Sequence, residues 1–155
     1  MGSTVYARKA AADNDRIVAM LSLETMGYFS DERGSQKYPF PMSVIDPDRG
    51  NFIAFVGNVD SRQLVRAAVG AFRETTSFPS EGAALPEHTT GVGWSDHKPF
   101  WDAGYPALMV TDTAPFRYRH YHTDKDTDDK VDLEHLTRVV SGLVRVVERL
   151  TTNER

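Results

Sequence analysis

The sequence contains no cysteine, no long apolar run and no block of basic residues. Without cysteine there is no disulfide, no thiolate ligand and no thiol nucleophile, so a bound metal would have to be held by His, Asp and Glu. No apolar run approaches the ~20 residues of a membrane-spanning helix, and the N-terminus lacks the basic start and apolar core of a signal peptide. We therefore expect a soluble protein without a membrane partner, and the sequence does not specify its compartment.

The charged residues are mixed along the chain, with a net charge of −4. A nucleic-acid partner normally requires a clustered basic face, so nucleic-acid binding is disfavoured. At 155 residues the chain has the size of one domain, which can bury roughly two thirds of its unfolded surface. No repeat, low-complexity tract or linker divides it, and we expect a single domain over residues 1–155.

Apolar periodicity predicts alternating strands and helices. Strands are expected at 17–23, 51–56 and 105–111, with a short extended piece at 83–85; helices are expected at 3–12, 60–76, 95–103 and 133–150. This alternation is typical of an α/β protein with a mainly parallel sheet.

Capping residues support three of these helices. Asp60, with Gln63 three residues later, has the spacing of a capping box, and Ser95 stands where it could cap the short helix. Asp132 precedes the last helix, in which apolar residues recur at helical spacing.

A long loop is expected at 27–50, because this stretch is rich in glycine, proline and polar residues and has no periodicity. Long loops inside compact domains usually cover or border a site. Tyr28, Phe29, Tyr38 and Phe40 could line a pocket for an apolar side chain, although loop aromatics more often attach the loop to the body of the protein.

The stretch 93–132 holds three of the five histidines and many of the acidic and aromatic residues around one apolar strand. Asp124, Asp126 and Asp128 alternate like the first ligands of a calcium loop. Such a loop needs glycine at position six and glutamate at position twelve, where this sequence has Asp129 and His135, so calcium is rejected.

A serine hydrolase is also disfavoured. The nucleophile elbow G-x-S-x-G would place Ser95 after Gly93, but His97 occupies the position of the second glycine.

His122 and Glu24 are candidate metal ligands with open alternatives. His122 follows a strand and a loop and is flanked by Tyr121 and by acids that could orient its second nitrogen, but a solvated ion pair is also compatible with this pattern. Glu24 ends a buried strand, where it could be a ligand or a salt-bridged structural acid. For His97, beside Asp96, a capping or core role is favoured over a ligand role.

Three stretches taken together resemble a known family. They are Leu23–Tyr28 (LETMGY), Ser95–Phe100 (SDHKPF) with the following Gly104–Ala107 (GYPA), and Tyr121–Thr123 (YHT) with Asp126 and Thr127 behind it. In this order they are similar to the zinc-dependent aminopeptidases with two co-catalytic metals (peptidase clan MH), whose fold also serves glutaminyl cyclases and several carboxypeptidases. The resemblance implies a three-layer α/β/α fold with a mostly parallel mixed sheet, zinc-aminopeptidase-like and also described as phosphorylase/hydrolase-like.

The resemblance also implies roles for single residues. Glu24 would bind one zinc ion and His122 the other, while Tyr121 would polarise the scissile carbonyl. Asp96 would belong to an acidic hydrogen-bond network behind the site, and His97 to its scaffold.

The sequence departs from the family pattern at its N-terminal end. The family has an H-x-D motif, whose aspartate bridges the metals, and a Glu-Glu pair that supplies the general base and a ligand; both lie upstream of the stretch that corresponds to Leu23–Tyr28. This chain has no Glu-Glu pair, and its one H-x-D, His122–Asp124, already belongs to the later motif. We therefore expect the C-terminal part of a catalytic domain, truncated at the N-terminus, with one terminal ligand for each metal.

The expected function is that of a zinc metallopeptidase whose parent hydrolyses N-terminal peptide bonds. The chain alone is expected to bind zinc weakly or not at all and to be inactive. A noncatalytic binding or assembly module on the same fold, or a relative of glutaminyl cyclases or carboxypeptidases, remains an alternative. Missing strands would expose a sheet edge, so self-association is also expected.

Overall fold

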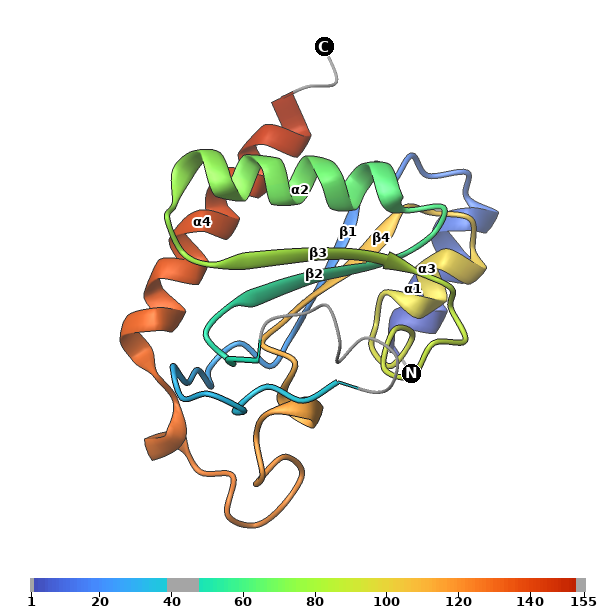
Figure 1. The fold of residues 1–155 in the computed structure, drawn as a ribbon. Helices are drawn as coiled ribbons and strands as arrows, with labels where there is room; N and C mark the ends of the chain where they lie inside the picture. The colour runs from blue at the N-terminus through green and yellow to red at the C-terminus, as the bar shows by residue number, and fades with distance from the viewer. Residues whose placement is uncertain (1, 39–47, 153–155) are drawn as a thin grey trace.

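The computed structural model describes residues 2–38 and 48–152 (Figure 1). In chain order the elements are α1 (Gly2–Ala12), β1 (Met20–Glu24), β2 (Ile53–Asn58), α2 (Arg62–Thr75), β3 (Ser80–Leu85), α3 (Lys98–Asp102), β4 (Ala107–Thr111) and α4 (Leu133–Thr152), with short 3-10 turns at Ala114–Phe116 and Asp128–Lys130. Apart from β1 and β2, which follow each other in this order, strands and helices alternate, and the predicted α/β class is confirmed.

The four strands form one mixed sheet in the order β1-β4-β2-β3. β1 is parallel to β4 and β2 is parallel to β3, whereas β2 and β4 are antiparallel. The sheet is thus mostly parallel, as expected. β1 and β4 end at the same edge of the sheet, where β2 and β3 begin.

One face of the sheet is covered by α2 and α4 (Figure 1). The core between them contains Ile53 and Phe55 of β2 and Phe72 of α2, all with no solvent exposure. Gly142 lets the two helices approach closely, because a Cβ atom there would lie 2.4 Å from Cε2 of Phe72. Apolar periodicity therefore predicted the buried face of α2 correctly. It predicted that of α4 only in part, because Leu143 is buried but Leu133, Val140 and Val147, which recur at the same helical spacing, are exposed.

The opposite face is covered by α1 and α3, and only toward the β1–β4 end. Ala7 of α1 packs with Phe100 and Trp101 of α3 and with Ala107 of β4 in a second, smaller core. The Trp101 indole also donates a hydrogen bond of 2.8 Å to the carbonyl of Ala107. With helices on both faces, the fold has the three layers that the family resemblance implied.

Several element boundaries differ from the predicted ones by a few residues. β1 begins at Met20, later than the apolar run suggested, and the 83–85 piece is the end of a longer strand, β3. The Asp60 capping box is wrong: Ser61 is the N-cap of α2, without a side-chain capping bond, and its backbone N–H donates to Oδ1 of Asn58 at 2.8 Å. The turn that follows β2 therefore determines where α2 begins, and the capping pattern at Asp60 does not.

The last helix begins as predicted. Asp132 accepts a hydrogen bond of 3.0 Å from the backbone N–H of His135 through Oδ1. Across the described ranges, 2–38 and 48–152, no helix combines the length and the apolar character that would let it cross a membrane.

Candidate active site

Glu24 is the last residue of β1 and is held by a serine from a distant loop. Its Oε2 accepts a hydrogen bond of 2.8 Å from the hydroxyl of Ser95. The Ser95 hydroxyl is itself 2.8 Å from that of Ser22, which lies two residues before Glu24 on the same strand face. Because Ser95 donates its proton to the carboxylate, Ser22 donates to Ser95. Ser95 therefore does not cap α3, and it positions Glu24.

The other oxygen of Glu24 has no hydrogen-bond partner within the part of the chain that the structure describes. Glu24 pairs in register with Thr111, the last residue of β4. The segments that follow the two strands consequently begin side by side, which brings 25–28 next to 112–122.

Three residues of these segments have left-handed backbone conformations: Thr25 at φ 44°, Thr113 at 62° and His122 at 57°. Such conformations are rare for residues other than glycine, and for a β-branched residue they store strain. The Thr25 hydroxyl lies 3.2 Å from that of Thr111, a contact between the two strand ends. Strained residues of this kind persist where tertiary contacts hold them, and they are frequent at active sites.

Asp112 joins the two segments and was missed by the sequence analysis. It is 1% exposed. Its Oδ2 accepts the backbone N–H groups of Gly27 and Tyr28, both at 2.9 Å, and its Oδ1 accepts that of Ala114 at 2.9 Å. Its own N–H donates to the carbonyl of Thr25 at 2.8 Å. The available signal was a carboxylate directly after the mostly apolar run of β4.

Burial raises the pKa of the Asp112 carboxyl above its ordinary value, and the Tyr28 amide and the Arg117 guanidinium oppose this increase. Asp112 is thus a buried acid whose hydrogen bonds set the relative position of the β1 and β4 ends.

Arg117 attaches the long loop to the same region. Its Nε donates to Oε1 of Gln36 at 2.7 Å, and its Nη1 donates to the carbonyls of Gly50 and Phe52 at 2.9 and 3.1 Å. The guanidinium also lies over the Phe52 ring, 4.5 Å from its centroid. Burial lowers the pKa of Arg117 to about 10, with Asp112 acting in the opposite direction. The guanidinium stays charged at neutral pH.

The aromatic residues of the 27–50 loop were expected either to line a pocket or to attach the loop to the body of the protein. Tyr28 packs on Tyr118 with ring centroids 4.6 Å apart, and Phe29 packs edge-on against Phe78 at 5.3 Å. These two residues attach the loop to the body. Phe40 lies outside the described residues.

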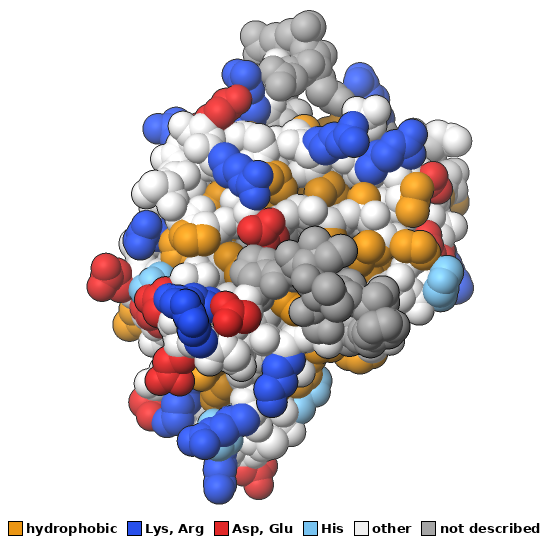
Figure 2. Space-filling view, viewed as in Figure 1, with side chains coloured by type: hydrophobic (Ala, Val, Ile, Leu, Met, Phe, Trp, Pro, Cys, Tyr) orange, Lys and Arg blue, Asp and Glu red, His pale blue; other side chains and the backbone are white. Residues whose placement is uncertain are grey.

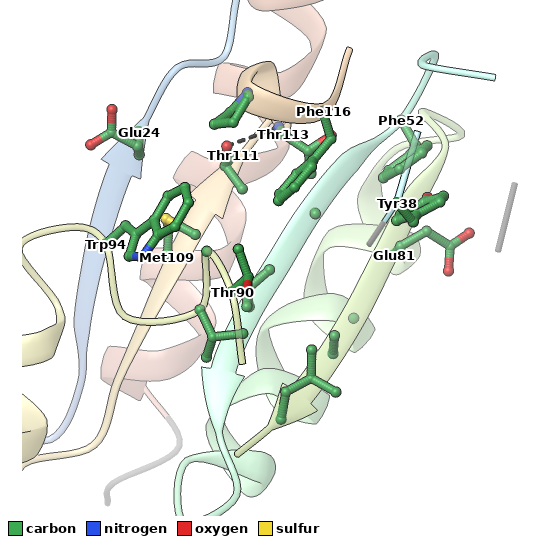
Figure 3. A pocket seen from close by; sticks show the side chains of 18 of the residues that line it. Glu24, Tyr38, Phe52, Glu81, Thr90, Trp94, Met109, Thr111, Thr113 and Phe116 are labelled. Atoms are coloured by element: carbon green, nitrogen blue, oxygen red, sulfur yellow. Dashed lines mark hydrogen bonds between the residues drawn. The ribbon is translucent and has the colours of Figure 1, made fainter. Parts of the chain in front are cut away.

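A pocket of about 160 Å³ lies over the part of the sheet that α1 and α3 leave uncovered, and Glu24 is among its lining residues (Figure 3). Small and apolar residues of β2, β3 and β4 form its floor, and aromatic residues surround it. The described lining residues are Glu24, Tyr38, Phe52, Ala54, Val56, Glu81, Gly82, Ala83, Leu85, Thr90, Gly91, Val92, Trp94, Met109, Thr111, Thr113, Pro115, Phe116 and Tyr121. Trp94 stands at the rim with 65% of its surface exposed. Such a concave, mostly apolar site suits a ligand with an apolar group.

Tyr121 returns from the loop after β4 to line this pocket together with Glu24. Burial, and then the charges of Glu24 and Asp112, raise the pKa of Tyr121 above its ordinary value. Its phenol therefore keeps its proton at neutral pH and can donate a hydrogen bond. His122 is exposed, and its ring stacks on that of Tyr121 with centroids 3.9 Å apart.

Asp96 and His97, the two residues of the SDH stretch beside Ser95, face different surroundings. Asp96 is exposed and accepts a hydrogen bond of 2.7 Å from the hydroxyl of Ser3 in α1. His97 is fully buried, with its ring edge-on to Trp101 at 4.4 Å. Its Nε2 lies 2.7 Å from the carbonyl of Val92, so Nε2 carries the proton and donates. His97 thereby holds the loop that presents Ser95.

His97 should make the stability of the protein sensitive to mild acid. Burial lowers its pKa below the ordinary value of 6.5, so the unfolded chain binds the proton more readily than the folded one. The contribution of the neutral imidazole is present above about pH 6.5 and is lost as the pH falls toward the folded-state pKa. We expect the free energy of unfolding of the wild type to fall more steeply between about pH 7 and 5 than that of His97→Gln.

Urea unfolding at several pH values measures this slope. His88→Gln is the matched control, because His88 is exposed, and it should keep the wild-type slope. Equal slopes for the wild type and His97→Gln would show that His97 is not the titrating group.

The two potential ligands, Glu24 and His122, are of types that bind zinc, but they are fewer than a zinc site needs. A carboxylate and an imidazole are both ordinary zinc ligands, and a catalytic site normally uses three protein ligands. Among the described residues, no three His, Asp or Glu side chains come together in a group that could hold a metal ion. The described residues therefore do not form a complete zinc site by themselves, and the assignment of Glu24 and His122 as ligands stays a prediction.

Comparison with known proteins assigns this chain to a family. The sequence model of "Peptidase family M28" matches residues 1–147. The uncharacterized protein YfbL of Escherichia coli is 36% identical over 148 residues, which are 95% of this chain and 45% of YfbL. The chain thus spans less than half of this curated relative.

Two solved aminopeptidases have similar structures. LapA of Legionella pneumophila superposes with a TM-score of 0.71 at 19% identity, covering 96% of this chain and 35% of LapA. The aminopeptidase of Aneurinibacillus sp. strain AM-1 superposes with a TM-score of 0.56 at 25% identity, covering 94% of this chain and 28% of that enzyme. These likenesses support the fold assignment, and in both cases the chain corresponds to about a third of the solved enzyme.

Proposed function

Because the chain belongs to peptidase family M28, we propose that it is part of a zinc-dependent aminopeptidase that removes N-terminal residues from peptides. One observation carries the proposal: Glu24 at the end of β1 and Tyr121 from the loop after β4 line the same pocket, although they are far apart in sequence. The carboxyl ends of neighbouring parallel strands are where α/β enzymes bind their ligands.

In this proposal Glu24, Ser95, His122 and Tyr121 each have a chemical role. Glu24 provides a carboxylate oxygen to one zinc ion, and Ser95 keeps that carboxylate in place. His122 provides an imidazole to the other ion. Tyr121, with its proton retained, donates a hydrogen bond to the oxyanion that develops on the scissile carbonyl. The pocket receives the side chain of the substrate.

The remaining ligands and the general base are proposed to come from sequence outside this chain. One terminal ligand per ion does not hold zinc tightly in water. The 155-residue chain alone should therefore bind zinc weakly or not at all and should not hydrolyse an aminoacyl p-nitroanilide. Calorimetric titration with zinc and a chromogenic assay test this, and clear zinc-dependent turnover by the chain alone would contradict the ligand count.

The activity itself is tested in the polypeptide encoded by the complete reading frame. That protein should be a zinc-dependent aminopeptidase, and Glu24→Ala and His122→Ala should each reduce its kcat/KM by at least a hundredfold. Glu134→Ala is the matched control, since Glu134 is an exposed acid of α4. Activity retained in both site variants would refute the assignment.

A noncatalytic binding module on the same fold is a second candidate, because the described residues bring no three potential metal ligands together. The same experiment separates the two functions. A complete reading frame that lacks an H-x-D motif and a Glu-Glu pair, with no zinc-dependent turnover, would favour the binding module.

We also propose that the chain self-associates through the β1 side of the sheet. β1 is an edge strand that pairs only with β4 among the described strands, and its Leu23 is 57% exposed. α4 exposes Val140, Val144 and Val147 at helical spacing. Unpaired strand edges and apolar surface promote pairing with another chain.

Light scattering at increasing protein concentration should therefore show dimers or larger species. Leu23→Lys, which places a charge on the edge strand, should shift the equilibrium toward the monomer, whereas Thr4→Lys on α1 should not. A wild type that stays monomeric at high concentration would refute the proposal.

A further inference from the structure

The pocket of the proposed active site carries a carboxylate at each end of one row of the sheet. Glu24 pairs in register with Thr111, Thr111 with Ala54, and Ala54 with Glu81. Directly paired residues point to the same face of a sheet, and all four line the pocket. Three steps between neighbouring strands separate the two acids, about 14 Å between their Cα atoms. Figure 3 shows Glu24 and Glu81 at opposite ends of the pocket.

The charges at the Glu81 end of this pocket favour a positively charged group, since the proposed function assigns Glu24 to a zinc ion. Glu24 and Glu81 are the acidic residues of the described lining, and that lining contains no Lys, Arg or His. Between the two acids the floor is made of small and apolar side chains, including Ala54, Ala83 and Met109. A carboxylate at the rim of a mostly apolar pocket attracts cations and disfavours anions.

The Glu81 carboxylate is only loosely engaged within the protein. Its side chain is 51% exposed, and its nearest charged partner is Nη2 of Arg73 at 3.8 Å, beyond hydrogen-bond distance. Arg73 already donates to Ser80, through Nε to the hydroxyl at 3.1 Å and through Nη2 to the carbonyl. No donor among the described residues makes a hydrogen bond to Glu81. The carboxylate can therefore accept from a ligand without breaking a hydrogen bond of the described structure.

We propose that this pocket takes a lysine or arginine side chain, and that Glu81 determines this specificity. The inference rests on the proposed aminopeptidase function, in which the pocket receives the side chain of the N-terminal residue. The methylene groups of the substrate cross the floor formed by Thr111 and Ala54, and the cation emerges at the open end beside Glu81. Long basic side chains commonly lie in this way, with the stem on apolar surface and the charge in water.

Binding of amino acid amides to the 155-residue chain tests the proposal without requiring turnover. L-Lysinamide and L-norleucinamide are a matched pair, because their side chains differ only by the terminal ammonium group. The methyl NMR signals of Ala54, Ala83 and Met109 report occupancy of the pocket. Lysinamide should bind the wild type about threefold to fivefold more tightly than norleucinamide, the effect of one solvent-exposed ion pair.

Glu81→Gln should abolish the preference and leave the affinity for norleucinamide unchanged, and Glu81→Lys should reverse it. Glu74→Gln is the matched control: Glu74 is an exposed acid of α2 outside the pocket lining, and this variant should keep the preference. Equal affinities for both amides in the wild type, or a preference that survives Glu81→Gln, would overturn the inference and leave the proposed function intact. Absence of any shift with either amide would overturn the inference together with the pocket's proposed role in substrate binding.

Discussion

Replacement of Asp112 by alanine is expected to lower the free energy of unfolding by about 3–5 kcal/mol, as is usual when one partner of a buried charged network is removed. Three backbone N–H groups, those of Gly27, Tyr28 and Ala114, would lose their acceptor. A buried donor without a partner costs about 1–3 kcal/mol. Urea unfolding at neutral pH, followed by circular dichroism, measures the loss.

Asp112→Asn separates the hydrogen bonds from the charge. Its amide oxygen can still accept from Gly27 and Tyr28, but its NH₂ group would then face the N–H of Ala114, so we expect a smaller loss than with alanine. Asp60→Ala, at an exposed position, should change the stability by less than about 0.5 kcal/mol. A loss below about 1 kcal/mol for Asp112→Ala would show that the strand ends hold their positions without this carboxylate.

Replacement of Arg117 by methionine is expected to cost about 3–4 kcal/mol, since methionine keeps most of the apolar stem but leaves buried acceptors unpaired. The acceptors are Oε1 of Gln36 and the carbonyls of Gly50 and Phe52. Arg119→Met is the matched control, because Arg119 is exposed and donates to His120. Equal losses in the two variants would mean that Arg117 is not the residue that holds the loop.

The two substitutions should not be additive. Asp112 and Arg117 interact electrostatically and anchor adjacent segments, so the double variant Asp112→Ala/Arg117→Met should lose less stability than the sum of the single losses. A coupling energy of about 1 kcal/mol or more is typical of residues in one network. Strict additivity would show that the two residues act independently.

The hydrogen bonds of Asp112, Arg117 and Ser95 explain how the residues of the proposed site are held in place. Asp112 links the segment after β1 to the end of β4, and Arg117 links the long loop to the same place. Ser95 comes from a third segment and holds Glu24. The proposed site is therefore built where three parts of the chain meet, and damage to Asp112 or Arg117 should affect both stability and ligand binding.

Local patterns in the sequence were sufficient for the elements of the fold. The apolar run of β4 and the helical spacing of α4 predicted elements close to those found, because periodicity reflects which side chains must leave water. The cap at Asp132 was also predicted correctly, since it depends on a hydrogen bond three residues away. The family followed from motifs in Leu23–Tyr28, Ser95–Phe100 and Tyr121–Thr123, and the match over residues 1–147 confirms it.

Long-range arrangement depended on the tertiary structure. The antiparallel pairing of β2 with β4 brings Thr111 opposite Ala54, and this pairing creates the row that ends in Glu81. Nothing near Glu81 in the sequence marks it as a pocket residue, because its partners in that row lie on other strands. Asp112 likewise gains its role from backbone groups more than 80 residues away. Local sequence thus specifies which segments form strands and helices, whereas the register between distant strands specifies which side chains share a site.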